Sequence, residues 1–178
     1  MIVVSKRAAD ADLPPARLFL ALWPGPRVRQ ALAACRDATP WPAGASPTAD
    51  DKLHVTLHFI GSVPAARVDE IGAALQVPVH RFELRLELAE VWHGALAVLR
   101  PRQVPDRLLQ LHADLAAALR PLGLPVEARA FRPHVTLARR GGPARPLPPA
   151  EPIRWRVTGY ALVQSRPDGR YQVLRRYR

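Results

Sequence analysis

The chain has 178 residues, of which 48% are hydrophobic, and its formal net charge is +11. This length and composition fit one compact domain with a sizeable core. Cys35 is the only cysteine, which excludes an intrachain disulfide. Because no stretch approaches the ~20 apolar residues that cross a bilayer, we expect a cytoplasmic, monomeric protein with no membrane partner.

Nearly all of the positive charge is arginine, because Lys6 and Lys52 are the only lysines. Guanidinium groups bind phosphate in a bidentate manner and stack on bases, so a polyanionic partner is expected, with RNA or DNA as the common case. Arginine-rich codon usage in a genome rich in G and C is an alternative source of the same charge, and the sequence leaves that alternative open.

The first predicted segment is a flexible tail at 1–16, which lacks the long apolar stretch of a signal peptide. Residues 17–178 are expected to form a single domain. Its first half is predicted to contain a strand at 17–23, a helix over 28–35, a loop over 37–52, a strand at 53–60 and a helix through Val68, Ile71 and Leu75.

The second half begins with clean alternation of apolar and polar residues at 82–88, which we expect to pair with 95–99 as a hairpin. The strongest helix is predicted at 106–122, ended by Gly123. A strand at 131–138, a basic loop at 140–152 and strands at 153–164 and 171–176 complete the chain. Alternation in several strands predicts antiparallel sheets with one solvent-exposed face. No glycine-rich loop follows a strand in the pattern of a nucleotide-binding fold.

One tetrapeptide, His-Val-Thr-Leu, occurs twice, beginning at His54 and at His134, and each copy falls in a predicted strand. Side chains two residues apart point to the same face of a strand. His54 therefore shares a face with Thr56, as His134 does with Thr136. The valine and leucine of each copy point into the core.

Two such strands facing one cleft would present two imidazoles and two hydroxyls. One histidine would accept a proton from water while the other donates a proton to the departing ribose oxygen. The Thr56 and Thr136 hydroxyls would bond the non-bridging phosphate oxygens as charge grows. These side chains would suffice for phosphoryl transfer without a cofactor or a metal. Because the two motifs are identical, the sequence pattern does not say which histidine is the acid.

Paired His-x-Thr-x motifs resemble those of the 2H phosphoesterase superfamily, and the surrounding sequence resembles its RNA 2′,3′-cyclic phosphodiesterases, also called 2′-5′ RNA ligases. Four blocks carry the resemblance in the family's order: RLFLALWP, LHVTLHFIGSV, FRPHVTLARR and LVQSRPDGRYQVL.

The resemblance implies a bilobed α+β fold, with two antiparallel sheets, outer helices, and motif strands that face each other across a central cleft. It also implies that His54 is the proton donor and His134 the acceptor. The implied reaction opens a 2′,3′-cyclic phosphate at an RNA end, tRNA fragments among the candidates, to leave a 2′-phosphate. Run in reverse, it gives 2′-5′ ligation.

The resemblance further suggests Phe59 and Arg139 as contacts to base and phosphate, although strict alternation turns both away from their histidines. Alternation instead places His58 on the face of His54 and Thr56, where it would contact RNA phosphate or remain solvated. A zinc site made of His54, His58 and His134 is an alternative, but no cysteine or carboxylate support is evident.

Two other functions remain open. A phosphodiesterase acting on a small cyclic nucleotide would use the same histidines, but the net charge of +11 favours a larger polyanion. A non-catalytic RNA-binding module fits the charge and the aromatic residues, but it leaves the two histidines unexplained.

Overall fold

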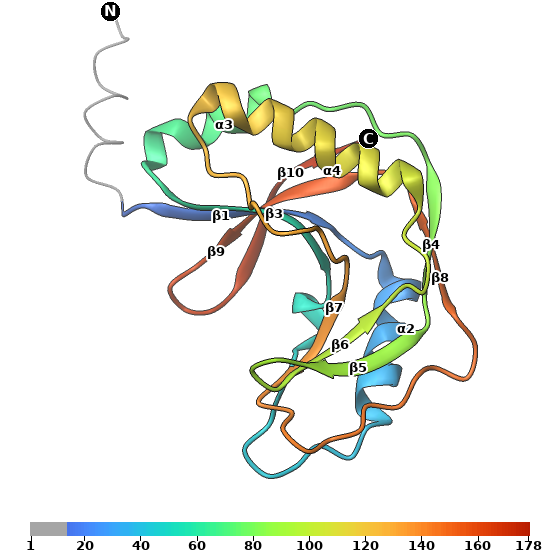
Figure 1. Ribbon diagram of the computed structural model, residues 1–178. Helices are drawn as coiled ribbons and strands as arrows, with labels where there is room; N and C mark the ends of the chain where they lie inside the picture. The colour runs from blue at the N-terminus through green and yellow to red at the C-terminus, as the bar shows by residue number, and fades with distance from the viewer. Residues whose placement is uncertain (1–13) are drawn as a thin grey trace, which may run out of the picture.

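The computed structural model describes residues 14–178 as an α+β domain with mostly antiparallel strands in two sheets (Figure 1). Residues 1–13 of the predicted tail lie outside the described residues, and Ala16 already belongs to the first strand. The strands are β1 (Ala16–Leu22), β2 (Ser46–Pro47), β3 (Val55–Val63), β4 (Phe82–Leu86), β5 (Leu88–Trp92), β6 (Leu96–Arg100), β7 (Val135–Arg139), β8 (Ile153–Val157), β9 (Tyr160–Ser165) and β10 (Tyr171–Tyr177). The helices are α2 (Pro26–Asp37), α3 (Val68–Ala74) and α4 (Asp106–Leu119).

The large sheet has the strand order β10-β9-β1-β3-β7-β6-β5, with β2 added on β7, and a second sheet consists of β4 and β8. The α+β class is therefore confirmed, but the division between the sheets differs from the expectation. The two motif strands, β3 and β7, are neighbours in one sheet and are joined there by a single pair, Val55 with Val135. Figure 1 shows β1, β9 and β10 on one side of this junction and β5 and β6 on the other. The two halves of the molecule thus share a sheet and meet at the motif strands.

The helices bury their apolar stripes against the sheets. In α4, Leu108, Leu111, Leu115 and Leu119 are buried, as the sequence pattern predicts. The segment ends at Gly123, whose φ of 67° is the left-handed conformation that glycine adopts without strain. α4 packs against β3, and α2 packs against β8. Among residues 14–178, no helix is both long and apolar enough to cross a membrane.

The predicted hairpin between 82–88 and 95–99 is wrong. β4 pairs with β8, whereas β6 pairs with β5 on one edge and with β7 on the other. The alternating segment is divided at Glu87, and its two parts belong to different sheets, without any glycine or proline to mark the change. The predicted strand at 153–164 is likewise divided, at Thr158 and Gly159, into β8 and β9.

Candidate active site

The two motif histidines are held in the same way. Each lies immediately before its strand, His54 before β3 and His134 before β7. Nδ1 of His54 lies 2.6 Å from the carbonyl oxygen of Lys52, and Nδ1 of His134 lies 2.7 Å from that of Arg132. Because a carbonyl only accepts, each Nδ1 carries the proton, and Nε2 of the neutral ring keeps its lone pair. In both rings Nε2 is therefore the nitrogen whose lone pair can exchange a proton.

A pocket of about 500 Å³ lies over the junction of β3 and β7 and contains both histidines. Nε2 of His54 lies 3.0 Å from the Thr56 hydroxyl oxygen, so these side chains share a face, as expected. Thr136 lines the pocket as well. The full lining consists of Phe19, Ser46, Pro47, Thr48, Ala49, Lys52, His54, Thr56, Phe59, Leu96, His134, Thr136, Arg139 and Tyr171.

A β-bulge in β3 changes the face on which the later residues of the first motif lie. Thr56 pairs with Ala21 of β1, but Leu20 pairs with His58, so Leu57 is an extra residue in the ladder. An extra residue reverses the alternation beyond it. Phe59 therefore returns to the pocket, where its side chain is 62% exposed.

The second motif carries the same irregularity at the same position. Val98 of β6 pairs with Thr136, but Ala97 pairs with Ala138, so Leu137 is the extra residue. Arg139 is thereby brought into the pocket. Strict alternation was thus wrong for both Phe59 and Arg139, which lie beside the histidines.

The expectation that His58 shares this face is also wrong, because of the bulge at Leu57. His58 is only 2% exposed and pairs with the fully buried Leu20. Its Nε2 lies 2.8 Å from the carbonyl oxygen of His112, and the two rings stack with centroids 4.0 Å apart. His112 in turn stacks on Phe131 at 4.0 Å. His58 is therefore a core residue between β3 and α4, and it contributes nothing to the pocket wall.

The same placement removes the basis for a zinc site made of His54, His58 and His134. Across residues 14–178, no group of three or more His, Cys, Asp or Glu side chains is arranged to hold a metal ion.

Aromatic rings surround the two histidines, and the sequence pattern alone had not assigned them to the site. The Trp23 ring stacks on His54 with centroids 5.6 Å apart and an interplanar angle of 21°. Phe19 and Tyr171 lie 5.1 and 5.6 Å from the same imidazole. Trp92 is the neighbour of His134, at 4.5 Å and tilted by 58°. Phe19, Trp23 and Tyr171 fall in two of the blocks that carry the family resemblance. The pairing of β1 with β3, of β10 with β9 and of β5 with β6 brings these rings and Trp92 to the histidines only in the folded sheet.

Burial determines the electrostatics of the pair. It lowers the pKa of His54 to about 4, and the nearby positive charge of His134 and Arg139 acts in the same direction. Burial also lowers the pKa of His134, to which Arg132 and Arg139 contribute. In each case the hydrogen bond to the backbone carbonyl opposes the shift. At neutral pH both imidazoles of the free protein are therefore neutral, and an anion between them would favour their protonation.

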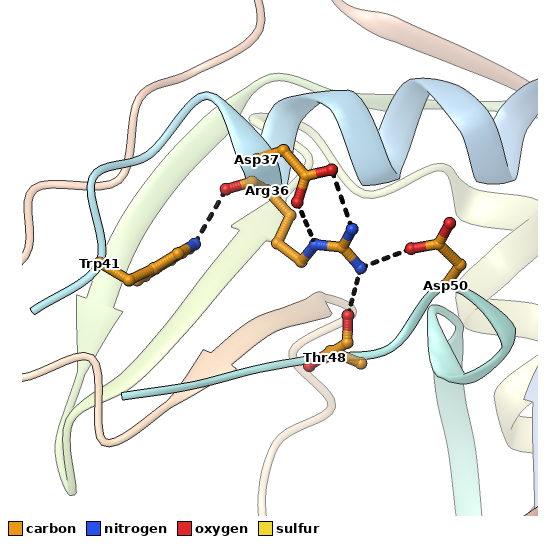
Figure 2. Close-up of polar contacts among 5 residues, drawn as sticks. All are labelled: Arg36, Asp37, Trp41, Thr48 and Asp50. Carbon is orange, nitrogen blue, oxygen red and sulfur yellow. Dashed lines mark hydrogen bonds and ion pairs between the residues drawn. The ribbon is translucent and has the colours of Figure 1, made fainter. Parts of the chain in front are cut away.

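One wall of the pocket, residues 46–52, is fastened to α2 by the buried guanidinium of Arg36 (Figure 2). This group bonds Asp37 and Asp50, each at 2.7 Å, and it donates to the carbonyl oxygen of Thr48. Thr48 N–H in turn donates to the carbonyl oxygen of Leu137, the bulged residue of the second motif, at 2.8 Å. The wall is thus connected to the strand that carries Arg139.

Comparison with known proteins places this arrangement in a family. Residues 24–169 match the 2′-5′ RNA ligase superfamily. The chain is 32% identical to the RNA 2′,3′-cyclic phosphodiesterase of Escherichia coli, over 92% of this chain and 96% of that protein. It is 31% identical to the protein of the same name from Thermus thermophilus, over 90% and 89%. The crystal structure of E. coli LigT complexed with 3′-AMP superimposes with a TM-score of 0.81, covering 92% of this chain and 97% of that one at 31% identity. The chain belongs to the 2′-5′ RNA ligase superfamily.

Proposed function

We propose that this protein is an RNA 2′,3′-cyclic phosphodiesterase that uses His54 and His134 as an acid–base pair. The observation that carries the proposal is the shared pocket of two imidazoles, each with Nδ1 bonded to a backbone carbonyl, so that Nε2 is the nitrogen that exchanges a proton. The names of the E. coli and Thermus relatives support the reaction, and E. coli LigT has been crystallised with 3′-AMP and with phosphate.

The proposed reaction is one hydrolytic step. Nε2 of His134 accepts a proton from a water molecule, whose oxygen attacks phosphorus. The bond between phosphorus and the ribose O3′ breaks, and O3′ receives a proton from Nε2 of His54. The product carries a 2′-phosphate and a free 3′-hydroxyl. The same steps, with a ribose 5′-hydroxyl in place of water as the nucleophile, join that oxygen to phosphorus as O3′ leaves, which gives weak 2′-5′ ligation.

The surroundings of the two rings support this assignment of roles, which itself comes from the family resemblance. A protonated imidazole is stabilised by the faces of aromatic rings. Among residues 14–178, three aromatic rings lie near His54, with Trp23 stacked on its face, whereas the tilted Trp92 alone lies beside His134. The stacked ring offsets part of the burial that lowers the pKa of His54. Arg139 and Phe59 line the same pocket. In the proposed complex the guanidinium of Arg139 binds the non-bridging phosphate oxygens, and the exposed ring of Phe59 stacks on a base.

The lowered pKa values predict how the rate depends on pH. A base must be deprotonated and an acid protonated, so the profile is bell-shaped, and kcat/KM reports the free protein. Because the pKa of both histidines is lowered in the free protein, the kcat/KM bell should lie on the acidic side of ~6.5. Bound phosphate raises both pKa values, so the bell for kcat should lie at higher pH.

The test is to incubate the protein with a short RNA ending in 2′,3′-cyclic phosphate and to identify the product end. A 2′-phosphate that forms equally well in EDTA supports the proposal. Activity that disappears in EDTA and returns with zinc would overturn the two-histidine mechanism. A cyclic mononucleotide opened more efficiently than RNA would instead favour the small-nucleotide alternative. tRNA fragments ending in cyclic phosphate are the first natural substrates to compare.

A further inference from the structure

A second hollow, of about 300 Å³, has Trp23 in its wall. Its lining includes Trp23, Thr158 and Gly159 together with Arg156, Arg176 and Arg178, and it contains no acidic residue. Since Trp23 also stacks on His54, a single ring separates this hollow from the candidate proton donor.

Strand register explains why arginine faces the hollow. A bulge in β10 lies between Val173, which pairs with Val163, and Arg175, which pairs with Leu162. Beyond it, Arg176 pairs with Ala161, which belongs to the small apolar cluster of Phe19 on the pocket side of the sheet. The neighbouring Arg175 points the other way and bonds the carbonyl oxygen of Gly72 at 2.9 Å.

The three arginines of the hollow are available to a ligand. Arg156, Arg176 and Arg178 are exposed, and none forms an ion pair with a carboxylate of residues 14–178. The opposite end of the catalytic pocket differs in this respect. There, Arg132 lies over the Trp92 ring at 4.0 Å, and both Arg132 and Arg100 pair with Glu90. Within residues 14–178, Glu90 therefore pairs with two arginines near Trp92, whereas the arginines of the hollow form no ion pair, although Glu83 lies opposite Arg156 in the ladder of β4 and β8.

We propose that this hollow, defined by Arg156, Arg176 and Arg178 with Trp23 at its entrance, binds the RNA strand on the 5′ side of the cyclic phosphate. Proteins hold single-stranded nucleic acid by combining a basic groove for the backbone with aromatic rings on which bases stack. Here the guanidinium groups contact phosphates. The half-buried Trp23, whose ring stacks on His54 at 5.6 Å and has the Arg29 guanidinium over it at 5.7 Å, contacts the preceding nucleotide beside Arg29. The inference rests on the proposed function and adds that the substrate is a polymer.

The test compares a dinucleotide with an RNA of about ten nucleotides, both ending in 2′,3′-cyclic phosphate. The parent protein should open the longer RNA with the higher kcat/KM. Replacing Arg156, Arg176 and Arg178 together by Gln should reduce the ratio of the two kcat/KM values by about tenfold or more. Three exposed arginines at or near α4 serve as the matched control, because replacing Arg102, Arg107 and Arg120 by Gln removes the same charge.

Salt dependence gives a second readout that does not need catalysis. Each phosphate contact to a single strand contributes about 0.7 to the slope of log K against log salt, so the variant should lose about 2 from this slope. A parent protein that gains nothing from the longer RNA would overturn the inference, as would an unchanged slope or a control that behaves like the variant. If neither substrate is opened, the proposed function fails. The salt dependence of RNA binding then still tests whether the hollow binds the RNA strand.

Discussion

The two motif segments, His54–Phe59 and His134–Arg139, adopt the same backbone course with different side chains at their ends. In both, Nδ1 of the histidine bonds the carbonyl two residues earlier, the threonine faces the pocket, and the leucine is the extra residue of a bulge. The residues after the bulge differ. The buried position holds His58 in one segment and Ala138 in the other, and the pocket position holds Phe59 or Arg139.

In the proposed mechanism, this difference separates chemistry from recognition. Proton transfer needs two similar imidazoles, so the histidine and threonine positions are alike. A nucleotide is not symmetric, since it has a flat aromatic base at one end and a charged phosphate at the other. The bulges deliver one residue suited to each, a phenyl ring from the first segment and a guanidinium from the second. The comparison can be tested one pair of positions at a time.

The histidine pair should give the largest effect. Replacing His54 or His134 by Ala should each lower kcat by at least ~10²-fold, because each removes one partner of the proton transfer. The double variant should lower kcat by far less than the product of the two single reductions, because the two histidines act as a unit. The measurement is single-turnover opening of a cyclic phosphate by folded protein. A His54→Ala protein as fast as the parent would refute the proposed mechanism.

Replacing Phe59 or Arg139, the residues that the bulges turn into the pocket, should give the next largest effects on the kinetics. These two effects should differ from each other. Arg139→Gln removes a charged donor to phosphate and should lower kcat/KM by about 10- to 100-fold. Phe59→Leu removes only a stacking surface and should raise KM by about tenfold with little change in kcat. Steady-state kinetics on one RNA distinguishes these patterns. Equal effects on kcat would mean that the two positions do not divide phosphate and base between them.

The threonines should give smaller and unequal losses. Thr56→Val removes a hydroxyl that lies 3.0 Å from Nε2 of His54 and that we propose bonds the substrate, so kcat should fall by roughly 5- to 10-fold. Thr136→Val should cost only a few-fold, because among residues 14–178 no hydrogen bond joins Thr136 to His134. Valine suits a strand, and the unfolding temperature therefore serves as the control for both variants. A larger loss at Thr136 would reverse the assignment.

How much of this could be predicted from the sequence depended on whether a feature was local. The duplicated tetrapeptide, the stripe of α4 and its stop at Gly123 are local patterns, and the structure has them where the sequence places them. The bulges at Leu57 and Leu137 are not encoded by any glycine or other local signal. They depend on how β1 and β6 pair with the motif strands, and for that reason the faces of His58, Phe59 and Arg139 were mispredicted from alternation.

The pair of buried positions, His58 and Ala138, should affect activity least and stability most. His58→Ala should change kcat by less than about threefold, because the side chain lies outside the pocket wall. It should lower the free energy of unfolding by about 2 kcal/mol, since it removes a packed ring and its bond to the carbonyl of His112. Urea unfolding at neutral pH measures this loss. A large loss of kcat without a loss of stability would place His58 in the chemistry after all.

The stacked imidazoles of His58 in β3 and His112 in α4 predict a loss of stability in acid. Burial lowers the pKa of His58 and lowers that of His112 to about 4, where proximity to His58 adds to the shift. An unfolded histidine titrates near ~6.5. Above that pH both states are neutral and the stability is complete. As the pH falls from ~6.5 towards 4, the unfolded chain takes up protons that the folded chain excludes, and stability is lost.

His112→Leu keeps an apolar side chain in the stack and should spare about 1–2 kcal/mol of this loss. His80→Ala, at an exposed position, is the matched control. Unfolding curves for His112→Leu and the parent that remain parallel from pH 7 to pH 4.5 would contradict the prediction.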